Sequence, residues 1–352
     1  MKNIKKILFV GASASLLLAS CKNGNIEFDD FDYSGVYFAY QYPIRTLVLG
    51  EDYVDNSLDN EHQFEVYATM GGVYQNDKTI NIDIEVDNSL CENLYIDTDK
   101  ALPIKALPEK YYSLSSDKIV LDKKFAGAVK VSLNDNFFED GNAINTYYAL
   151  PIKMVNASNV DKILTGEPNQ GVTSPVRTNP ADWKVLPKDY VLYLIKYINP
   201  YDANYLRRGV DEIKFNGRTQ EVVRHAKYVE KDEVCTISTI SLDETLFPVE
   251  FTYKVGNTDN KLGCDLTLTF NDDQECVIST SSPDFTATGT GAYVKDGELN
   301  SWGSKTRSAL YLDYNITYKA GTLDEIVCAT KDTLVLRDRG VVVEALLPNY
   351  IK

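Results

Sequence analysis

The sequence is poor in histidine, methionine and tryptophan, with two, three and two residues respectively among 352. So few histidines exclude metal sites built from a histidine cluster and argue against histidine-based catalysis. Basic residues are also in deficit, because 36 Lys and Arg stand against 51 Asp and Glu, for a net charge of −15. Binding to nucleic acid or to anionic lipid needs a basic face, so neither is expected as a partner.

Tyrosine, in contrast, is abundant, with 24 residues, and hydrophobic residues make up 44% of the chain. This composition is sufficient for a packed core, and the length suits two ordinary domains or one large β domain. Tyrosine, valine and threonine favour strands, and no long amphipathic helical pattern is present. The sequence therefore predicts an all-β protein.

The start of the chain has the pattern of an export signal. Residues 1–6 carry three lysines, and the next twelve residues are apolar or small, which is too short to span a bilayer. The following residues, Leu-Ala-Ser-Cys at 18–21, resemble a bacterial lipobox, in which Cys21 is acylated and becomes the first residue of the mature chain. We expect a signal peptide over 1–20, a polar tether over 21–32, and an outer-membrane lipoprotein exposed at the cell surface. The alternative is an ordinary apolar N-terminal helix with an incidental cysteine.

Beyond Cys21 the cysteines indicate little. They are an odd number without C-x-x-C spacing, so no zinc site is predicted. Both a disulfide between Cys264 and Cys276 and buried free thiols remain open. The remaining cysteines are Cys91, Cys235, Cys264, Cys276 and Cys328.

Two β domains are expected. Residues 33–164 contain about seven short alternating segments, of which 80–86 is the clearest, and this pattern predicts a sandwich resembling the immunoglobulin type. Residues 165–182 are rich in Gly and Pro and predict a linker. The segment 183–352 then reads as a second domain.

The second domain has the pattern of an antiparallel meander. An almost continuous apolar run covers 190–198, and Asn216-Gly217 between apolar segments is a strong hairpin signal. About eight to ten strands follow one another and must close or curl to protect their edges. We expect a barrel or a curled sandwich, with a lipocalin-like barrel as the specific expectation.

Several short phrases resemble those of a two-domain family of Bacteroidota lipoproteins of unknown function, whose N-terminal domain also precedes family-18 endo-glycosidase domains. The phrases are LPEKYYSL at 107–114, YALPI at 148–152, NPY at 199–201, YLRRG at 205–209 and DTLVLRDRG at 332–340. This resemblance implies a surface lipoprotein that works beside a glycan importer of the starch-utilisation type. It carries no site residues with it.

Sugar rings pack on aromatic faces while their hydroxyls need polar partners, and both are often presented by loops on a β scaffold. Trp302, in a glycine-flanked loop, is the first candidate for glycan binding, although it is equally compatible with a plug over the barrel end. Tyr201 and Tyr205 with Arg207 form a second candidate platform, or else an ordinary strand end. Trp183 is a further candidate, with an interdomain wedge as its alternative interpretation.

The sequence is compatible with four functions. The first is a glycan-binding accessory of an outer-membrane uptake system, and the second is a structural or adhesin-like lipoprotein that docks to another outer-membrane protein. A divergent glycan hydrolase and a small-molecule carrier in the barrel are lesser alternatives. No serine-hydrolase, zinc-protease, phosphate-loop or calcium-loop motif is present, so we expect no catalytic residues, no metal and no cofactor.

Overall fold

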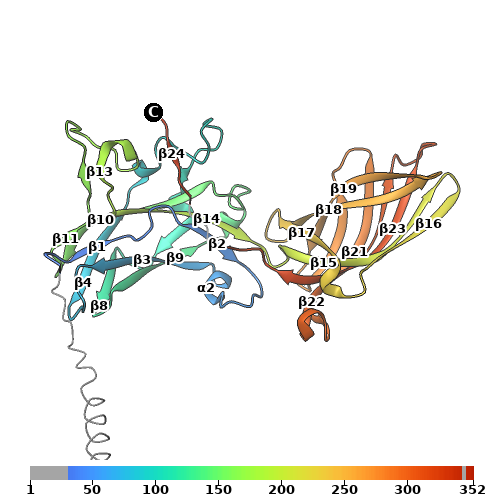
Figure 1. Cartoon of the computed structure of the whole chain (residues 1–352), viewed down its shortest axis with the longest axis horizontal. Helices are drawn as coiled ribbons and strands as arrows, with labels where there is room; N and C mark the ends of the chain where they lie inside the picture. Colours follow the sequence, from blue (N-terminus) through green and yellow to red (C-terminus); the bar gives the residue numbers. More distant parts are fainter. Residues whose placement is uncertain (1–30, 343–345) are drawn as a thin grey trace, which may run out of the picture.

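The computed structural model describes residues 31–342 and 346–352, and two bodies built from strands make up this part of the chain (Figure 1). Its helical segments are short turns of three or four residues. They are α2 (Ser57–Asn60), η2 (Asn88–Cys91), η3 (Glu109–Tyr111), α3 (Asp135–Phe138), η4 (Pro180–Asp182), η5 (Val229–Lys231) and η6 (Trp302–Ser304). The expected all-β fold is confirmed. In the described residues no helix is long and apolar enough to span a bilayer.

The first body is a sandwich of two sheets. One sheet contains, in spatial order, β11 (Lys162–Ile163), β1 (Gly35–Tyr37), β3 (Gln63–Gly71), β9 (Ala126–Leu133) and β7 (Tyr112–Leu114). The other contains β2 (Ile44–Val48), β14 (Tyr190–Ile198), β10 (Tyr148–Ser158), β4 (Thr79–Val86) and β8 (Lys118–Asp122), with β6 (Lys105–Ala106) beside β10. The sandwich expected for the first domain is therefore present.

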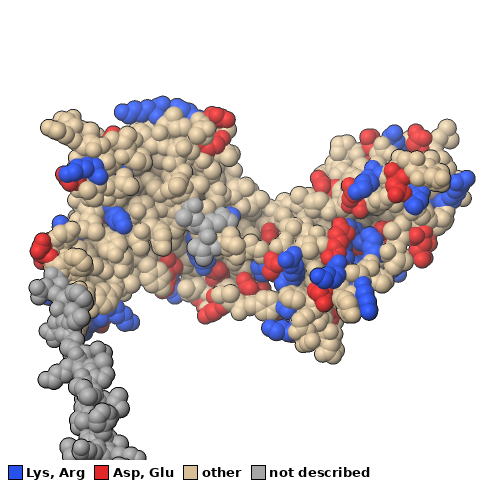
Figure 2. All heavy atoms as spheres, in the orientation of Figure 1, with Lys and Arg blue, Asp and Glu red and all other residues tan. Residues whose placement is uncertain are grey.

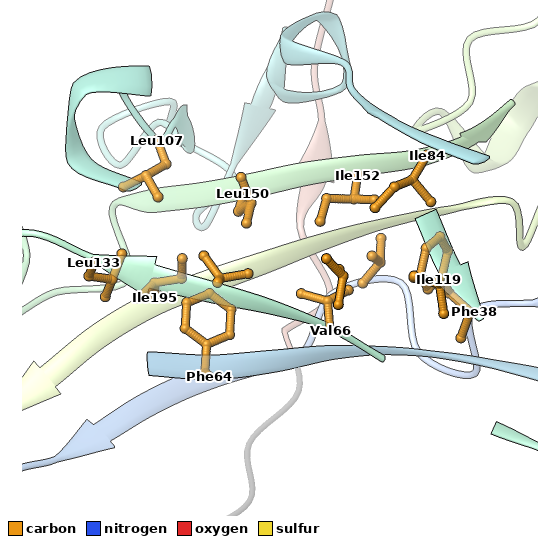
Figure 3. Packing of buried hydrophobic residues seen from close by; sticks show 14 of the residues in the cluster. Phe38, Phe64, Val66, Ile84, Leu107, Ile119, Leu133, Leu150, Ile152 and Ile195 are labelled. Atoms are coloured by element: carbon orange, nitrogen blue, oxygen red, sulfur yellow. The ribbon is translucent and has the colours of Figure 1, made fainter. Parts of the chain in front are cut away.

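The core of the sandwich is formed by side chains that alternate along the strands. Phe64 and Val66 of β3 point from one sheet toward Leu150 and Ile152 of β10 in the other, and all four are fully buried (Figure 3). Glu65, between the two β3 residues, points away from this core, as the twofold periodicity of a strand requires, whereas Pro151, between the two β10 residues, is itself buried. Burying one such side chain contributes about 1.5–3 kcal/mol, which is why the alternating pattern determines the register.

Strand β14 corrects the expected domain boundary. Its residues Tyr190–Ile198, assigned from the sequence to the second domain, pair antiparallel with β10 and parallel with β2 in the first body. One face of β14 packs into the sandwich core through Val191 and Ile195, while Leu192 and Leu194 pack into a smaller apolar cluster on the other face. A strand buried on both faces reads as a continuous apolar run, and such a run does not reveal which sheet it joins.

The end of the chain also returns to the first body. Strand β24 (Asn349–Tyr350) pairs with β5 (Leu94–Tyr95), and both lie in the first body. The expectation that the second domain extends to residue 352 is therefore wrong for this segment. The short strands β12 (Glu167–Pro168) and β13 (Trp183–Val185) pair with each other within the segment expected to be a linker and just after it.

The second body is a barrel. In the described residues eight strands pair in sequence, and β15 closes the ring by pairing with both β17 and β23. The strands are β15 (Ala203–Phe215), β17 (Glu233–Thr239), β18 (Glu244–Val255), β19 (Thr258–Phe270), β20 (Glu275–Thr280), β21 (Phe285–Glu298), β22 (Arg307–Tyr318) and β23 (Ile326–Asp338). Strand β16 (Arg218–Arg224) extends the outer half of β15. The expected meander barrel is confirmed.

The Asn216-Gly217 hairpin is also as expected. It joins β15 to β16, and both of its residues have positive φ angles, 51° and 70°. This backbone twist matches the twist of the flanking strands, and Asn and Gly adopt it at low cost.

Arg339 holds the two bodies together where they meet. Its guanidinium donates hydrogen bonds to the backbone carbonyls of Leu49, Glu51, Asn199 and Asp202, at 2.7–3.1 Å for the closest contact to each. The side chain is buried, and its four acceptors come from the end of the first body and the entry to the barrel. The junction therefore has a defined geometry that can support a site built from both bodies.

Candidate functional site

Two of the tyrosines expected to bind glycan lie inside the barrel. Tyr201 is 7% exposed and stacks on Phe270, with ring centroids 3.5 Å apart and planes 10° apart. Tyr205 is fully buried, and its hydroxyl donates a hydrogen bond of 2.8 Å to the Tyr201 carbonyl. Their assignment to glycan binding is wrong, because neither ring offers a face to solvent.

Arg207 is also buried, and its guanidinium binds other side chains inside the barrel. Its Nε and Nη2 donate to Oδ2 of Asp332 at 3.0 and 2.9 Å, and Nη2 also reaches the Tyr314 hydroxyl. Arg224 donates to the other carboxylate oxygen of Asp332 at 2.7 Å and to both oxygens of Asp211. Two cations and two anions thus compensate one another, and the sequence could not show this because the partners lie on distant strands.

Trp183 occupies neither of its expected positions. It is 9% exposed, its indole N–H donates to the Val176 carbonyl at 2.8 Å, and it starts β13. In Figure 1 this strand lies on the side of the first body away from the barrel, so Trp183 is not an interdomain wedge. Cys21 lies outside the described residues.

Trp302 lies in a tightly shaped loop between β21 and β22, below the barrel in Figure 1. The ring is half-buried, and its N–H donates to the Leu336 carbonyl on β23 at 3.1 Å. Asn300 and Ser304 in this loop, and Asp296 in the irregular end of β21 before it, have positive φ angles of 49–55°. Non-glycine residues in this conformation are uncommon and often mark functional loops, so the loop has a shape that needs support from its surroundings.

Arg307 provides that support and links the loop to the first body. Its guanidinium lies 3.5 Å from the centroid of the Trp302 ring and 5.4 Å from that of Tyr53, and its Nη1 donates to the Tyr53 hydroxyl. Arg307 is 5% exposed, whereas Tyr53 is 66% exposed. The cation is therefore held between two aromatic rings, one from each body, and Tyr53 presents most of its surface to solvent.

Charged residues surround this stack. Glu51 and Lys295 form an ion pair across the junction. The Tyr311 hydroxyl donates to Glu298 at 2.8 Å, and burial together with this hydrogen bond raises the pKa of Tyr311 to about 12. Leu299 in the same loop is 75% exposed. The arrangement therefore places an aromatic surface, a carboxylate and an ammonium group side by side.

We name this arrangement the junction platform. It consists of Glu51, Tyr53, Lys295, Leu299, Trp302 and Arg307. Aromatic rings suit the C–H faces of sugars, while the charged groups suit their hydroxyls. Sequence reasoning found Trp302 but missed Tyr53, because nothing in the polar loop around Tyr53 indicates that it lies beside a residue about 250 positions away.

A second aromatic-lined position lies on the first body alone. A hollow of about 690 Å³ is lined in part by Tyr33 and Tyr37, and the ammonium groups of Lys162 and Lys188 lie over these rings. Across residues 31–342 and 346–352, no group of three or more His, Cys, Asp or Glu side chains is placed to hold a metal ion.

Fold and junction together define an all-β protein of two bodies, a sandwich followed by a barrel, and comparisons with known proteins give the same division. Residues 30–161 match a family described as an N-terminal domain, and residues 200–340 match a domain of unknown function, DUF5627. A crystal structure of a protein of unknown function from Bacteroides ovatus is 41% identical, with a TM-score of 0.84 over 91% of this chain and 100% of that chain. No curated protein matches the chain.

The identity and coverage show that the chain belongs to the same family as the Bacteroides ovatus protein, a two-domain family of unknown function. The second matched segment begins at residue 200, directly after β14 ends at Ile198. This agrees with the pairing of β14 in the first body.

Proposed function

We propose that the protein is a glycan-binding lipoprotein of the cell surface, and that the junction platform is where it contacts the glycan. The observation that carries this proposal is the stack of Tyr53, Arg307 and Trp302, which fixes aromatic surface at an exposed position. A platform held in place before binding loses little conformational entropy when a ligand arrives. Weak, repeated contacts of this kind suit capture of a polymer for a neighbouring importer.

The proposed anchor is the acylated Cys21, with residues 21–32 as a tether to the outer membrane. Several acyl chains on one cysteine give stable membrane attachment, in contrast to a single chain. Mass spectrometry of the native protein tests this proposal. We expect loss of residues 1–20 and an acylated Cys21, and an intact, unmodified Met1 would contradict it.

The proposed binding is tested on a glycan array that includes host and dietary polysaccharides. Wild type is expected to be retained by at least one glycan, while Trp302→Ala and Tyr53→Ala weaken retention about tenfold or more, because each removes an aromatic contact. Tyr40→Ala is the matched control, since Tyr40 is 72% exposed and lies before β2, whereas Tyr53 follows it. Equal loss in Tyr40→Ala, or no retention of wild type, would contradict the proposal.

We also propose that binding occurs without catalysis. Wild type incubated with the glycan that it retains is expected to leave the chain length of that glycan unchanged. Shorter products, measured by chromatography, would favour a divergent hydrolase instead.

A docking role is the second candidate function, and the exposed Leu299 favours it. This side chain is 75% exposed three residues before the half-buried Trp302, so the loop presents apolar surface on which another protein could pack. Co-purification with an outer-membrane importer that is lost in Leu299→Asp, together with unchanged glycan retention, would support docking at this position. Loss of glycan retention alone would support the first proposal.

A further inference from the structure

A hollow of about 410 Å³ lies at the tip of the barrel, between two hairpins. One hairpin is β15–β16 and the other is β18–β19. The hollow is lined by Ile213, Phe215, Asn216, Arg218, Gln220, Tyr253, Lys254, Val255 and Gly256. In Figure 1 the ends of these strands lie at the side of the barrel away from the junction, so this position is separate from the junction platform.

The strand pairing explains why the barrel opens at this position. Strand β15 pairs with β17 over its first residues and with β16 over its last ones. Strand β18 pairs with β17 only near its start, through Thr245 and Leu246, so the outer half of β18 is paired through β19 alone. A hydrogen bond of 3.0 Å from the Lys254 backbone N–H to the Gln220 side chain joins the two hairpins there.

The lining combines an aromatic floor with a basic and amide rim. Phe215 and Tyr253 meet edge to face, with ring centroids 5.4 Å apart, and Ile213 beside them is buried. Arg218 and Lys254 supply two positive charges at the rim, while none of the nine lining residues is acidic. The chain as a whole has a net charge of −15, and Figure 2 shows basic and acidic side chains interspersed at this end of the barrel.

The two cations are available to a ligand. The Arg218 side chain is exposed and forms no hydrogen bond or ion pair with any residue of the described chain. Lys254 lies 3.6 Å from Asp259, but both side chains are about 60% exposed, and such surface pairs contribute little. Gln220 uses its carbonyl oxygen for Lys254, which leaves its amide N–H groups free to donate.

We propose that this hollow binds a sugar that carries a carboxylate, such as a hexuronate residue. Arg218 and Lys254 would hold the carboxylate, the ring would pack on Tyr253 and Phe215, and Gln220 with Asn216 would donate to hydroxyls. The volume suits one sugar unit at the lower end of ligand sites. This inference goes beyond the proposed function, because it assigns a second site with its own ligand chemistry.

The test is titration calorimetry of the purified protein with D-glucuronate and, as the neutral counterpart, D-glucose. Wild type is expected to bind glucuronate and not glucose, with an affinity that falls as salt is added. Arg218→Gln and Lys254→Gln each remove one charge-assisted contact and are expected to weaken binding about tenfold. Lys261→Gln is the matched control, because Lys261 is an exposed lysine on the same hairpin that pairs with Glu250.

Equal binding of the two sugars, no binding of glucuronate, or an unchanged affinity for glucuronate in either variant would overturn the proposal. All three variants change exposed side chains, and circular dichroism verifies that they fold. The test also separates this site from the junction platform. Trp302→Ala is expected to retain glucuronate binding unchanged, so failure of glycan capture at the platform leaves the uronate result intact.

Discussion

The guanidinium of Arg307 lies 3.5 Å from the centre of the Trp302 ring. This relationship fixes the most prominent loop of the barrel, and the same guanidinium extends the contact to Tyr53 of the first body. The aromatic surface of the junction platform therefore depends on a buried cation rather than on the rings alone.

Replacing that cation is expected to loosen the platform. Arg307→Gln removes a cation–π contact worth about 0.5–2 kcal/mol and the hydrogen bond to Tyr53. We expect a red shift of Trp302 fluorescence as the ring gains solvent, together with weaker glycan retention. Arg337→Gln serves as the control, because its side chain is 47% exposed. An unchanged spectrum in Arg307→Gln would show that the loop holds its shape without the cation.

The ion network inside the barrel predicts a large loss of stability on breaking one partner. Asp332→Asn removes the charge that accepts from Arg207, Arg224 and Tyr314, and leaves two arginines incompletely compensated. Breaking a buried pair costs about 3–5 kcal/mol, so the unfolding midpoint in urea should fall markedly.

The control for this prediction is Asp313→Asn in the neighbouring strand. Asp313 pairs with Lys331 at 3.3 Å, but the two side chains are 63% and 79% exposed. Exposed pairs contribute about 0–1 kcal/mol, so this variant should unfold almost like wild type. Comparable midpoints for Asp332→Asn and Asp313→Asn would contradict the structural role given to the network.

His62 predicts a dependence of stability on pH. Burial lowers the pKa of His62 below 6.5, although Asp135 acts in the opposite direction. Because the folded-state pKa is below the unfolded value, the folded state binds fewer protons at intermediate pH. The contribution of neutral His62 to the stability of the fold is complete above pH 6.5 and is lost as the pH falls through the folded-state pKa of His62.

Urea unfolding at neutral pH and at about pH 5 measures this effect. His62→Asn is the suitable variant, because His62 has a φ of 57° and Asn tolerates this conformation. We expect a smaller loss of stability on acidification in the variant than in wild type. The same pH dependence in both would assign the effect to other groups.

The cysteines of the described chain are expected to be unreactive in the native state. All five are free thiols, and the disulfide weighed between Cys264 and Cys276 is not formed in this structure. The pKa of the Cys91, Cys235 and Cys276 thiols is raised to about 12 and that of the Cys328 thiol to about 11, mainly because these thiols are buried. Because the thiolate is the reactive form, a thiol reagent should modify these cysteines only after unfolding. Rapid modification of the native protein would contradict this burial.

Local patterns were sufficient for much of the fold. Alternation along β3 and β4 predicted strands with one buried face, and Asn216-Gly217 predicted its hairpin, because these signals act between neighbouring residues. The partner of β14 could not be predicted, because the sequence of a strand buried on both faces is a continuous apolar run that does not indicate which strands it pairs with. Its assignment required the pairing with β10.

The candidate site was predictable only in part. Trp302 was found from its glycine-flanked loop, while Tyr53 and Arg307 depend on a contact between the two bodies. The predicted glycan-binding role of Tyr205 and Arg207 was wrong, because tyrosine and arginine suit both exposed binding surfaces and buried networks. Arg207 is buried because it pairs with Asp332, and the sequence does not indicate this pairing because Asp332 lies 125 positions away.

The most direct measurement of the central claim is a crystal structure of the protein with an oligosaccharide that the array identifies. The account predicts a sugar ring packed against Tyr53 and Trp302, with hydroxyls that hydrogen-bond to Glu51 or Lys295. An oligosaccharide bound elsewhere on either body, with the junction platform empty, would contradict it.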